Sequence, residues 1–170
     1  AKSCILIEPT TNTIVYEKNS NEKMYPASTT KILTAILTME KCDLKDTVTI
    51  TNEMVSKVPA GYTSAYLKPG EQLTIEQLLN ALLVPSANDA GFALAIHISG
   101  SVENFSILMN EKAKEIGCTN SNFTNPSGIH SENHYSTAKD MALIGLYSLK
   151  YPQITSICSQ TSYTLEIPQS

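Results

Sequence analysis

The fold is decided by the stretch Met24-Tyr-Pro-Ala-Ser28-Thr-Thr-Lys31-Ile-Leu-Thr-Ala-Ile-Leu-Thr-Met-Glu40. Pro26 suits the start of a helix, where backbone N–H groups have no partners within the helix, and nothing breaks the helix before Cys42. The apolar residues after Lys31 cover most of the helix circumference, which is typical of a helix buried on nearly all sides. We therefore predict a central core helix that carries one serine and one lysine at its start.

Ser28 and Lys31 are three residues apart, so a helix places them on one face within side-chain reach. A serine hydroxyl becomes a good nucleophile when a base takes its proton, and a lysine can be that base only as a neutral amine. Burial and the positive end of the helix dipole both disfavour the ammonium form. The helix N-terminus would also point the backbone N–H of Ser28 toward a developing oxyanion.

The S-x-x-K spacing is not specific by itself, because it occurs three times, starting at Ser20, Ser28 and Ser136. The first copy lies in a polar loop. The third is typical of a helix N-cap, with the helix running through Lys150. For Ser28 a simple capped helix start is the alternative on this pattern alone.

A second polar cluster, Ser86-Ala-Asn88-Asp89, lies between two apolar segments. The first is predicted to be a helix with Thr74 as its N-cap and a stop at Pro85, and the second a helix over residues 90–98. Polar side chains between two buried helices indicate a cleft, because buried polar groups are costly without partners. Ser131-Glu-Asn133 has the same S-x-N spacing, but it lies in a loop without flanking helices and is discounted.

Composition narrows the class of protein. A chain of 170 residues with 42% hydrophobic and 16% charged residues predicts one globular domain and argues against disorder. The net charge of −4, without a lysine-rich run, argues against a nucleic-acid surface, and an anionic substrate would need one specific local cation. No membrane span or signal peptide is evident, so an exported protein would be present here in processed form.

The cysteines and histidines do not favour a metal site. The four cysteines have no C-x-x-C spacing and are predicted to be buried free thiols: Cys4, Cys42, Cys118 and Cys158. His130 and His134 are four residues apart, but their loop offers no obvious third ligand.

The remaining chain predicts a mixed fold. Residues 3–8 and 13–18 are predicted to form a hairpin, residues 47–51 a short strand, and residues 103–116 an amphipathic helix ended by Gly117. A further strand is expected at about 162–167, with a helical region from about 26 to 150. Strands at both ends indicate a sheet that the N-terminus begins and a later segment would resume.

The two motifs in this order resemble the penicillin-recognising serine D-alanyl-D-alanine carboxypeptidases of low molecular mass. Segments such as Asn125-Pro-Ser-Gly128 and His134-Tyr-Ser-Thr-Ala-Lys-Asp-Met-Ala142 also resemble that family, and the similarity spans essentially all 170 residues. It implies an α/β (α+β) fold of the β-lactamase/transpeptidase type, in which an antiparallel sheet accompanies a mostly helical subdomain.

The resemblance also implies a reaction and its partners. Ser28 would attack the carbonyl between two terminal D-alanines of a peptidoglycan stem peptide, with Lys31 as its base. Ser86 would relay a proton to the leaving amine, and Asn88 would bind the substrate amide. β-Lactam antibiotics would acylate the same serine on the extracytoplasmic face of a bacterial membrane or in the cell wall. No metal or organic cofactor is implied.

One element of the family pattern is missing, because no lysine in the chain is followed by Thr or Ser and then Gly. The K-[TS]-G strand should supply a second oxyanion donor and a cation for the substrate carboxylate. Residues 1–170 are therefore expected to be the N-terminal part of one catalytic domain with an incomplete sheet, completed by a C-terminal piece that carries K-[TS]-G.

Two alternatives stay open. A serine β-lactamase shares the first motifs but needs a group that activates water for deacylation, and the candidates by position are Glu103, Glu111, Glu115 and Glu132. A non-catalytic peptidoglycan-binding or regulatory relative could keep the fold without the third motif.

Overall fold

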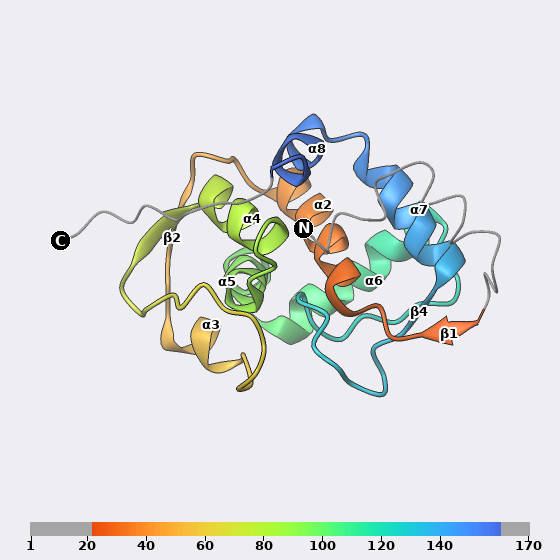
Figure 1. Cartoon of the computed structure of the whole chain (residues 1–170), viewed down its shortest axis with the longest axis horizontal. Coiled ribbons are helices and arrows are strands. Elements are labelled where there is room, and N and C mark those ends of the chain that lie inside the picture. The colour runs from red at the N-terminus through yellow and green to blue at the C-terminus, as the bar shows by residue number, and fades with distance from the viewer. Residues whose placement is uncertain (1–21, 161–170) are drawn as a thin grey trace.

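The computed structural model describes residues 22–160, and this part of the chain is mainly helical (Figure 1). The predicted strands at 3–8, 13–18 and 162–167 lie outside the described residues. The elements follow one another as β1 (Lys23–Met24), η2 (a 3₁₀ turn, Ala27–Thr29), α2 (Thr30–Lys41), β2 (Thr47–Thr49), α3 (Asn52–Ser56), β3 (Gln72–Thr74), α4 (Ile75–Leu83), α5 (Asn88–Ser99), α6 (Val102–Ile116), β4 (Ser136–Thr137), α7 (Ala138–Ser148) and α8 (Pro152–Cys158).

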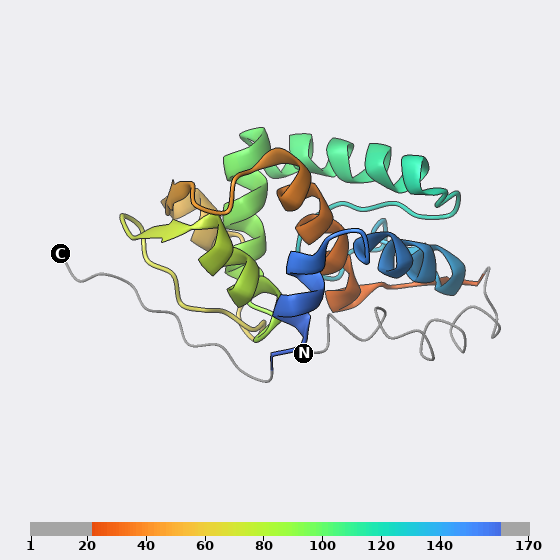
Figure 2. The same ribbon diagram turned by 90° about the horizontal axis from the view of Figure 1, so that it is seen from above.

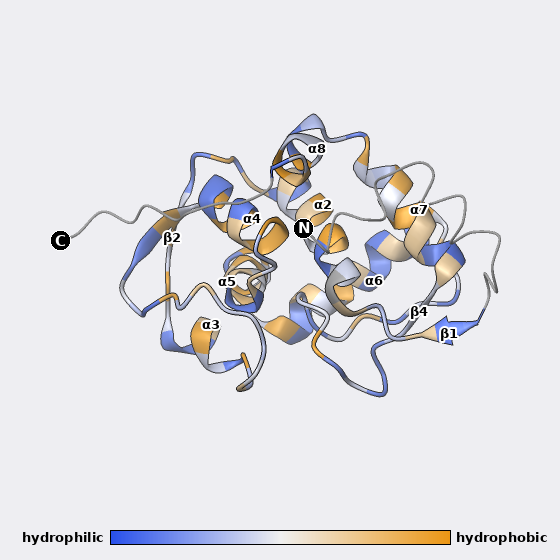
Figure 3. Cartoon of the chain, viewed as in Figure 1, coloured by the Kyte–Doolittle hydropathy of each residue, from blue (hydrophilic) through white to orange (hydrophobic). Residues whose placement is uncertain are grey.

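Helix α2 is the central core helix that the sequence predicts. All nine residues from Thr30 to Thr38 are buried, so the helix is covered on every side for most of its length. It packs against α4 and α5 on one side and against α6 and α7 on the other, as two perpendicular views show (Figures 1 and 2). Hydrophobic residues gather on α2, α4 and α5 at the centre of the molecule (Figure 3).

Local signals set the ends of the helices around α2. Thr74 caps α4 as predicted: its hydroxyl accepts from the backbone N–H of Gln77 at 3.1 Å, and the Gln77 side chain accepts from the N–H of Thr74 at 2.9 Å. Helix α6 ends at Gly117, whose φ of 112° provides the left-handed end that glycine favours. Helix α5 begins at Asn88, two residues earlier than predicted, so Asn88 and Asp89 belong to its first turn.

The strands of the described residues form two small antiparallel sheets. Strand β1 pairs with β4, bringing Met24 opposite Ser136, and β2 pairs with β3. The predicted helix N-cap at Ser136 is wrong: both residues form β4, but Thr137 caps α7 by accepting from the backbone N–H of Asp140 at 3.1 Å, while the hydroxyl of Ser136 lies 2.7 Å from that of Ser121. The helix also ends at Ser148, earlier than predicted.

The prediction that the cysteines are free thiols is wrong for one of them. Cys42 and Cys118 are free thiols, as predicted, but Cys158 is disulfide-bonded. Burial, with a smaller contribution from the charge of Asp140, raises the pKa of the Cys118 thiol to about 12, so this thiol stays protonated.

For residues 22–160, none of the helices taken singly has the length and apolar character to cross a membrane. Helices α5 and α6 reach that length only as a pair, and the pair bends by 87° at its junction.

Candidate active site

Ser28 lies in a 3₁₀ turn that leads directly into α2. The carbonyl of Pro26 accepts from the backbone N–H of Thr29 at 3.0 Å and also from its hydroxyl, which closes the turn. Ala27, immediately before Ser28, has a φ of 47°. This left-handed conformation costs an L-residue about 1–2 kcal/mol, and such strain is found preferentially at functional sites.

Lys31 lies in the first turn of α2, and its side chain is almost completely buried, with 1% exposed. Burial lowers its pKa to about 8, because the apolar surroundings disfavour the ammonium ion. Near neutral pH a useful fraction of this amine is therefore uncharged, which is the property that a lysine base requires. In the sequence it follows Ser28 by three positions, at the head of a buried helix.

Ser86 and Asn88 lie where α4 gives way to α5. Ser86 is half-buried and has a φ of 60°, so this predicted site residue is itself in a left-handed conformation. Asn88 is buried, with 5% exposed, and begins α5. Its backbone N–H and its side-chain amide both donate to the carbonyl of Thr63, at 2.9 and 2.8 Å. Asn88 therefore ties the start of α5 to the preceding loop.

Asp89, which the sequence interpretation gave no role, holds that same loop. Its carboxylate accepts from the hydroxyl of Ser64 at 2.9 Å and from the backbone N–H groups of Ala65 at 2.9 Å and Leu67 at 3.0 Å. The side chain is 2% exposed. The sequence does show an acidic residue between two apolar segments, and this could have marked Asp89 as a structural residue. Its partners could not be predicted, because they lie more than 20 residues away in the chain.

One turn connects the two predicted motifs. Gly128 lies against the carbonyl of Ala27, beside Ser28, and the hydroxyl of the neighbouring Ser127 donates to the carbonyl of Asn88 at 2.8 Å. Residues 127–128 thus contact both the Ala27 backbone beside Ser28 and the start of α5. The structure brings the S-x-x-K and S-x-N segments to one place, although they are about 60 residues apart in the chain.

His134 is buried and has both ring nitrogens engaged, so it is not placed as a metal ligand. Nδ1 accepts from the backbone N–H of Thr124 at 2.9 Å, and Nε2 lies 2.8 Å from the hydroxyl of Thr30. Among residues 22–160 no group of three or more His, Cys, Asp or Glu side chains is arranged to hold a metal. Neighbouring His130 contacts the ring of Tyr25 instead, at 4.4 Å between ring centroids.

The carboxylates that a β-lactamase would need are not buried in the described structure. All four candidates are exposed: Glu103, Glu111, Glu115 and Glu132. Glu115 pairs with Lys112 at 3.2 Å on α6. They are surface carboxylates on α6 and on the loop that follows it.

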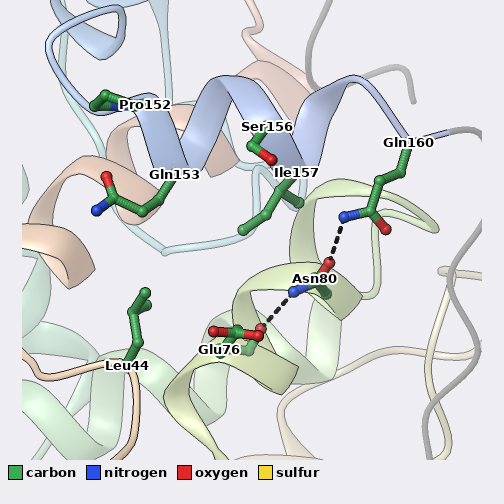
Figure 4. A pocket seen from close by; sticks show the side chains of 8 residues that line it. All are labelled: Leu44, Glu76, Asn80, Pro152, Gln153, Ser156, Ile157 and Gln160. Atoms are coloured by element: carbon green, nitrogen blue, oxygen red, sulfur yellow. Dashed lines mark hydrogen bonds between the residues drawn. The ribbon is translucent and has the colours of Figure 1, made fainter.

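A pocket of about 450 Å³ lies away from these motifs, between α4 and α8 (Figure 4). Polar side chains line much of it, and the side chains of Gln160 and Asn80 join across it through a hydrogen bond of 3.2 Å. None of the four predicted site residues lines this pocket. We therefore do not assign it to the candidate active site.

Comparison with known proteins decides the family. The model of the Peptidase S11 family, described as D-alanyl-D-alanine carboxypeptidase, matches residues 1–169. The chain belongs to the Peptidase S11 family. A curated S11 relative, D-alanyl-D-alanine carboxypeptidase DacF of Bacillus subtilis, is 44% identical over 160 residues, which cover 91% of the chain and 40% of the relative.

Solved structures place the fold in the same group. Penicillin binding protein 5 from Haemophilus influenzae superposes with a TM-score of 0.80 at 35% identity, covering 86% of this chain and 44% of that one. A mutant of the Streptomyces K15 DD-transpeptidase superposes with a TM-score of 0.82 at 29% identity, covering 87% and 60%. The predicted α+β transpeptidase-like fold is confirmed. The chain spans less than half the length of the curated S11 relative DacF.

Proposed function

We propose that this S11 chain forms the acylating half of a serine D,D-carboxypeptidase, which removes the terminal D-alanine from peptidoglycan stem peptides. The observation that carries the proposal is the buried Lys31, whose pKa is about 8, one helical turn after Ser28 in a chain of this family. The family match favours a carboxypeptidase over the β-lactamase alternative, and the exposed glutamates give that alternative no support.

The first step is attack by the oxygen of Ser28 on the carbonyl carbon of the penultimate D-alanine. The neutral amine of Lys31 takes the hydroxyl proton as the new C–O bond forms. The backbone N–H of Ser28, in the 3₁₀ turn that precedes α2, is one donor to the oxyanion. Ala27, next to the proposed nucleophile, and Ser86, the proposed proton relay, both have a left-handed backbone conformation, which supports this assignment.

The second step releases D-alanine. The C–N bond breaks, Ser86 passes a proton to the leaving amine, and Asn88 binds the amide of the stem peptide. Water then attacks the acyl-enzyme, which frees the shortened peptide and returns the proton to Ser28. A β-lactam follows the same first step, because its strained amide occupies the position of the scissile bond.

A K-[TS]-G segment outside residues 1–170 completes this site. Losing one oxyanion donor typically lowers the rate by about 100- to 1000-fold, so the chain needs the donor that this strand carries. The segment also supplies the cation for the terminal carboxylate of the substrate. We place the enzyme at the extracytoplasmic face of a bacterial membrane or in the cell wall, where its substrate is, and propose no nucleic-acid partner.

The experiment is penicillin labelling of the complete protein, followed by mass spectrometry. A long-lived adduct on Ser28, lost in Ser28→Ala, is expected. Rapid turnover of penicillin without a persistent adduct would favour the β-lactamase, and indifference of all activities to Ser28→Ala would favour a non-catalytic binding protein. Full carboxypeptidase turnover by residues 1–170 alone would refute the need for a K-[TS]-G segment.

A further inference from the structure

Residues 125–128, Asn125-Pro126-Ser127-Gly128, form a turn that contacts three separate elements; we call it the bridging turn. The oxygen of the Asn125 side chain accepts from three successive backbone N–H groups, of Ser127 at 3.1 Å, Gly128 at 2.7 Å and Ile129 at 3.1 Å. Its amide nitrogen donates to the carbonyl of Ile129 at 2.8 Å. One side chain thus fixes the shape of the whole turn, so the turn can transmit position between the elements that it touches.

On one side the bridging turn contacts α5. Ser127 is 1% exposed, and its hydroxyl donates to the carbonyl of Asn88 at 2.8 Å. The space for this hydroxyl exists because residue 91 is a glycine: a Cβ built at Gly91 would lie 2.2 Å from the oxygen of Ser127. Ser127 therefore fits against the first turn of α5 with no room to move toward it.

On the other side the bridging turn contacts the segment of Ser28. A Cβ built at Gly128 would lie 1.7 Å from the carbonyl oxygen of Ala27, so the two backbones are in direct contact. Gly128 also has a φ of 81°, a conformation that glycine adopts freely. The carbonyl of Pro126 accepts from the hydroxyl of Thr34 on α2 at 2.6 Å, which holds the turn against the central helix.

We propose that Ser127 is a positioning residue for acylation, which sets Asn88 and the start of α5 relative to the Ala27–Ser28 peptide through the bridging turn. This inference rests on the proposed function, because it assigns Ser127 to the same site. Among the described contacts, Ser127 reaches the site through Asn88 and Gly128. A misplacement of about 1 Å between reacting groups can lower a rate by about 100-fold, so a fixed spacer between the two motifs matters for the rate.

The test is the first-order rate constant of acylation by a fluorescent penicillin, measured in the complete protein. Ser127→Ala is expected to lower this constant by about 10- to 100-fold. Ser148→Ala is the matched control, because Ser148 is also fully buried and its hydroxyl donates to a carbonyl, that of Gly145, at 2.5 Å within α7. The control should leave the constant within about twofold of the parent.

The acylation rate constant distinguishes a positioning role of Ser127 from a purely structural one. A residue with a purely structural role would lower the fraction of protein that can be acylated, while the remaining molecules would react at the parental rate. With a D-Ala-D-Ala peptide, Ser127→Ala should lower kcat more than it raises KM. A parental rate constant with a smaller labelled fraction would overturn the inference.

Gly91→Ala provides an independent variant that acts on the same contact. Its methyl group displaces the Ser127 hydroxyl and should slow acylation at least as much as Ser127→Ala. In the double variant Gly91→Ala/Ser127→Ala the clash disappears, since the nearest remaining contacts of the new Cβ are Leu82 at 3.3 Å and the Ser127 Cβ at 3.4 Å. The double variant should therefore acylate no more slowly than Ser127→Ala alone. Losses that multiply would overturn the inference.

Ser28→Ala separates this inference from the proposed function. If Ser28→Ala abolishes labelling while Ser127→Ala and Gly91→Ala acylate at the parental rate, the positioning role fails and the proposed function stands. If Ser28→Ala is still labelled as fast as the parent, both fail together.

Discussion

His134 and Thr30 share a buried hydrogen bond, with 2.8 Å between the imidazole Nε2 and the hydroxyl oxygen, although 104 positions separate them in the chain. The backbone N–H of Thr124 donates to Nδ1 of the same ring, so the neutral ring carries its proton on Nε2 and donates it to Thr30. A second proton on Nδ1 would face that backbone N–H. The ring thus ties the loop after α6 to the residue next to Lys31 only while it is neutral.

The pH dependence of stability should reveal this histidine. Burial, with a smaller contribution from His130, lowers the pKa of His134 from 6.5 to about 4. Between these values the unfolded chain binds a proton that the folded chain does not, so the free energy of unfolding falls as the pH drops from 6.5 to 4. We expect a loss of up to about 3 kcal/mol, complete near pH 4 and absent above pH 6.5. Urea unfolding of the complete protein across this range measures it.

His134→Gln removes the titrating group and should flatten the curve in that window. His130→Gln is the control, because His130 is exposed and should leave most of the slope in place. If the parent and His134→Gln lose stability equally between pH 6.5 and 4, other groups cause the loss.

Acylation should follow the titration of Lys31. Because the pKa of Lys31 is about 8, the fraction of neutral amine rises about tenfold for each unit that the pH increases toward 8. The acylation rate constant should rise in the same way and become constant above pH 8. Lys31→Ala should lower the constant by about 100- to 10,000-fold, the usual contribution of a general base. Lys41→Ala, at the exposed end of the same helix, is the control and should keep the parental profile. A profile that is flat from pH 6 to 9 would exclude Lys31 as the base.

The sequence predicts the parts of this fold that depend on local patterns. The apolar run after Lys31 predicts a helix buried on all sides, the Thr74 and Gln77 pair predicts a helix start, and Gly117 predicts a helix end. Each of these depends on residues within one or two helical turns, so spacing alone carries the information. Helices α3 and α8 were not predicted, because five and seven residues give too short a pattern.

The parts that the sequence does not predict depend on distant contacts. Ser136 and Thr137 are both plausible caps and both belong to β4, but the hydroxyl of Ser136 bonds with that of the distant Ser121 at 2.7 Å, which leaves the cap to Thr137. The site motifs were named from their spacing, but the turn that joins them is about 40 residues beyond Asn88. Only the folded structure shows that Ser127 and Gly128 lie between the two motifs.

An ion pair between the buried Lys112 and the exposed Glu40 should contribute to the stability of the helices around α2. Nζ of Lys112 lies 2.6 Å from the carboxylate of Glu40 and 4.8 Å from the ring centroid of Tyr147, and the lysine side chain is 7% exposed. Lys112→Ala removes the cation beside the exposed Glu40 carboxylate and also the packed stem of the lysine, so we expect a loss of about 1–2 kcal/mol in urea unfolding. Lys112→Met removes the charge but keeps most of the apolar stem, so comparing it with Lys112→Ala separates the contribution of the ion pair from that of packing.

Lys114→Ala is the surface control for this pair, because Lys114 is exposed on the same helix, and it should change stability by less than about 0.5 kcal/mol. Equal effects of Lys112→Ala and Lys114→Ala would show that the pair with Glu40 adds nothing.

Loss of the Asp89 carboxylate should release the loop of residues 63–67. Asp89→Ala leaves the buried N–H groups of Ala65 and Leu67 without their acceptor, each at a cost of about 1–3 kcal/mol, so the loop should detach rather than stay packed. Limited chymotrypsin digestion measures this through cleavage after Tyr62, just before the loop, and after Tyr66 within it. We expect cleavage there to be at least tenfold faster than in the parent, and acylation to be slower, because Asn88 holds the same loop through Thr63.

Asp43→Ala is the control for this last variant. Asp43 is exposed, and its carboxylate accepts a single backbone N–H, that of Lys45, at 2.8 Å. Its loss removes a similar local hydrogen bond without touching the 63–67 loop, so chymotrypsin cleavage after Tyr62 and Tyr66 should keep the parental rate. Because Asn88 and Thr63 stay linked in Asp89→Ala, parental cleavage in that variant would mean that the Asn88 contacts alone hold the loop, and Asp89 would then have no separate role in shaping the site.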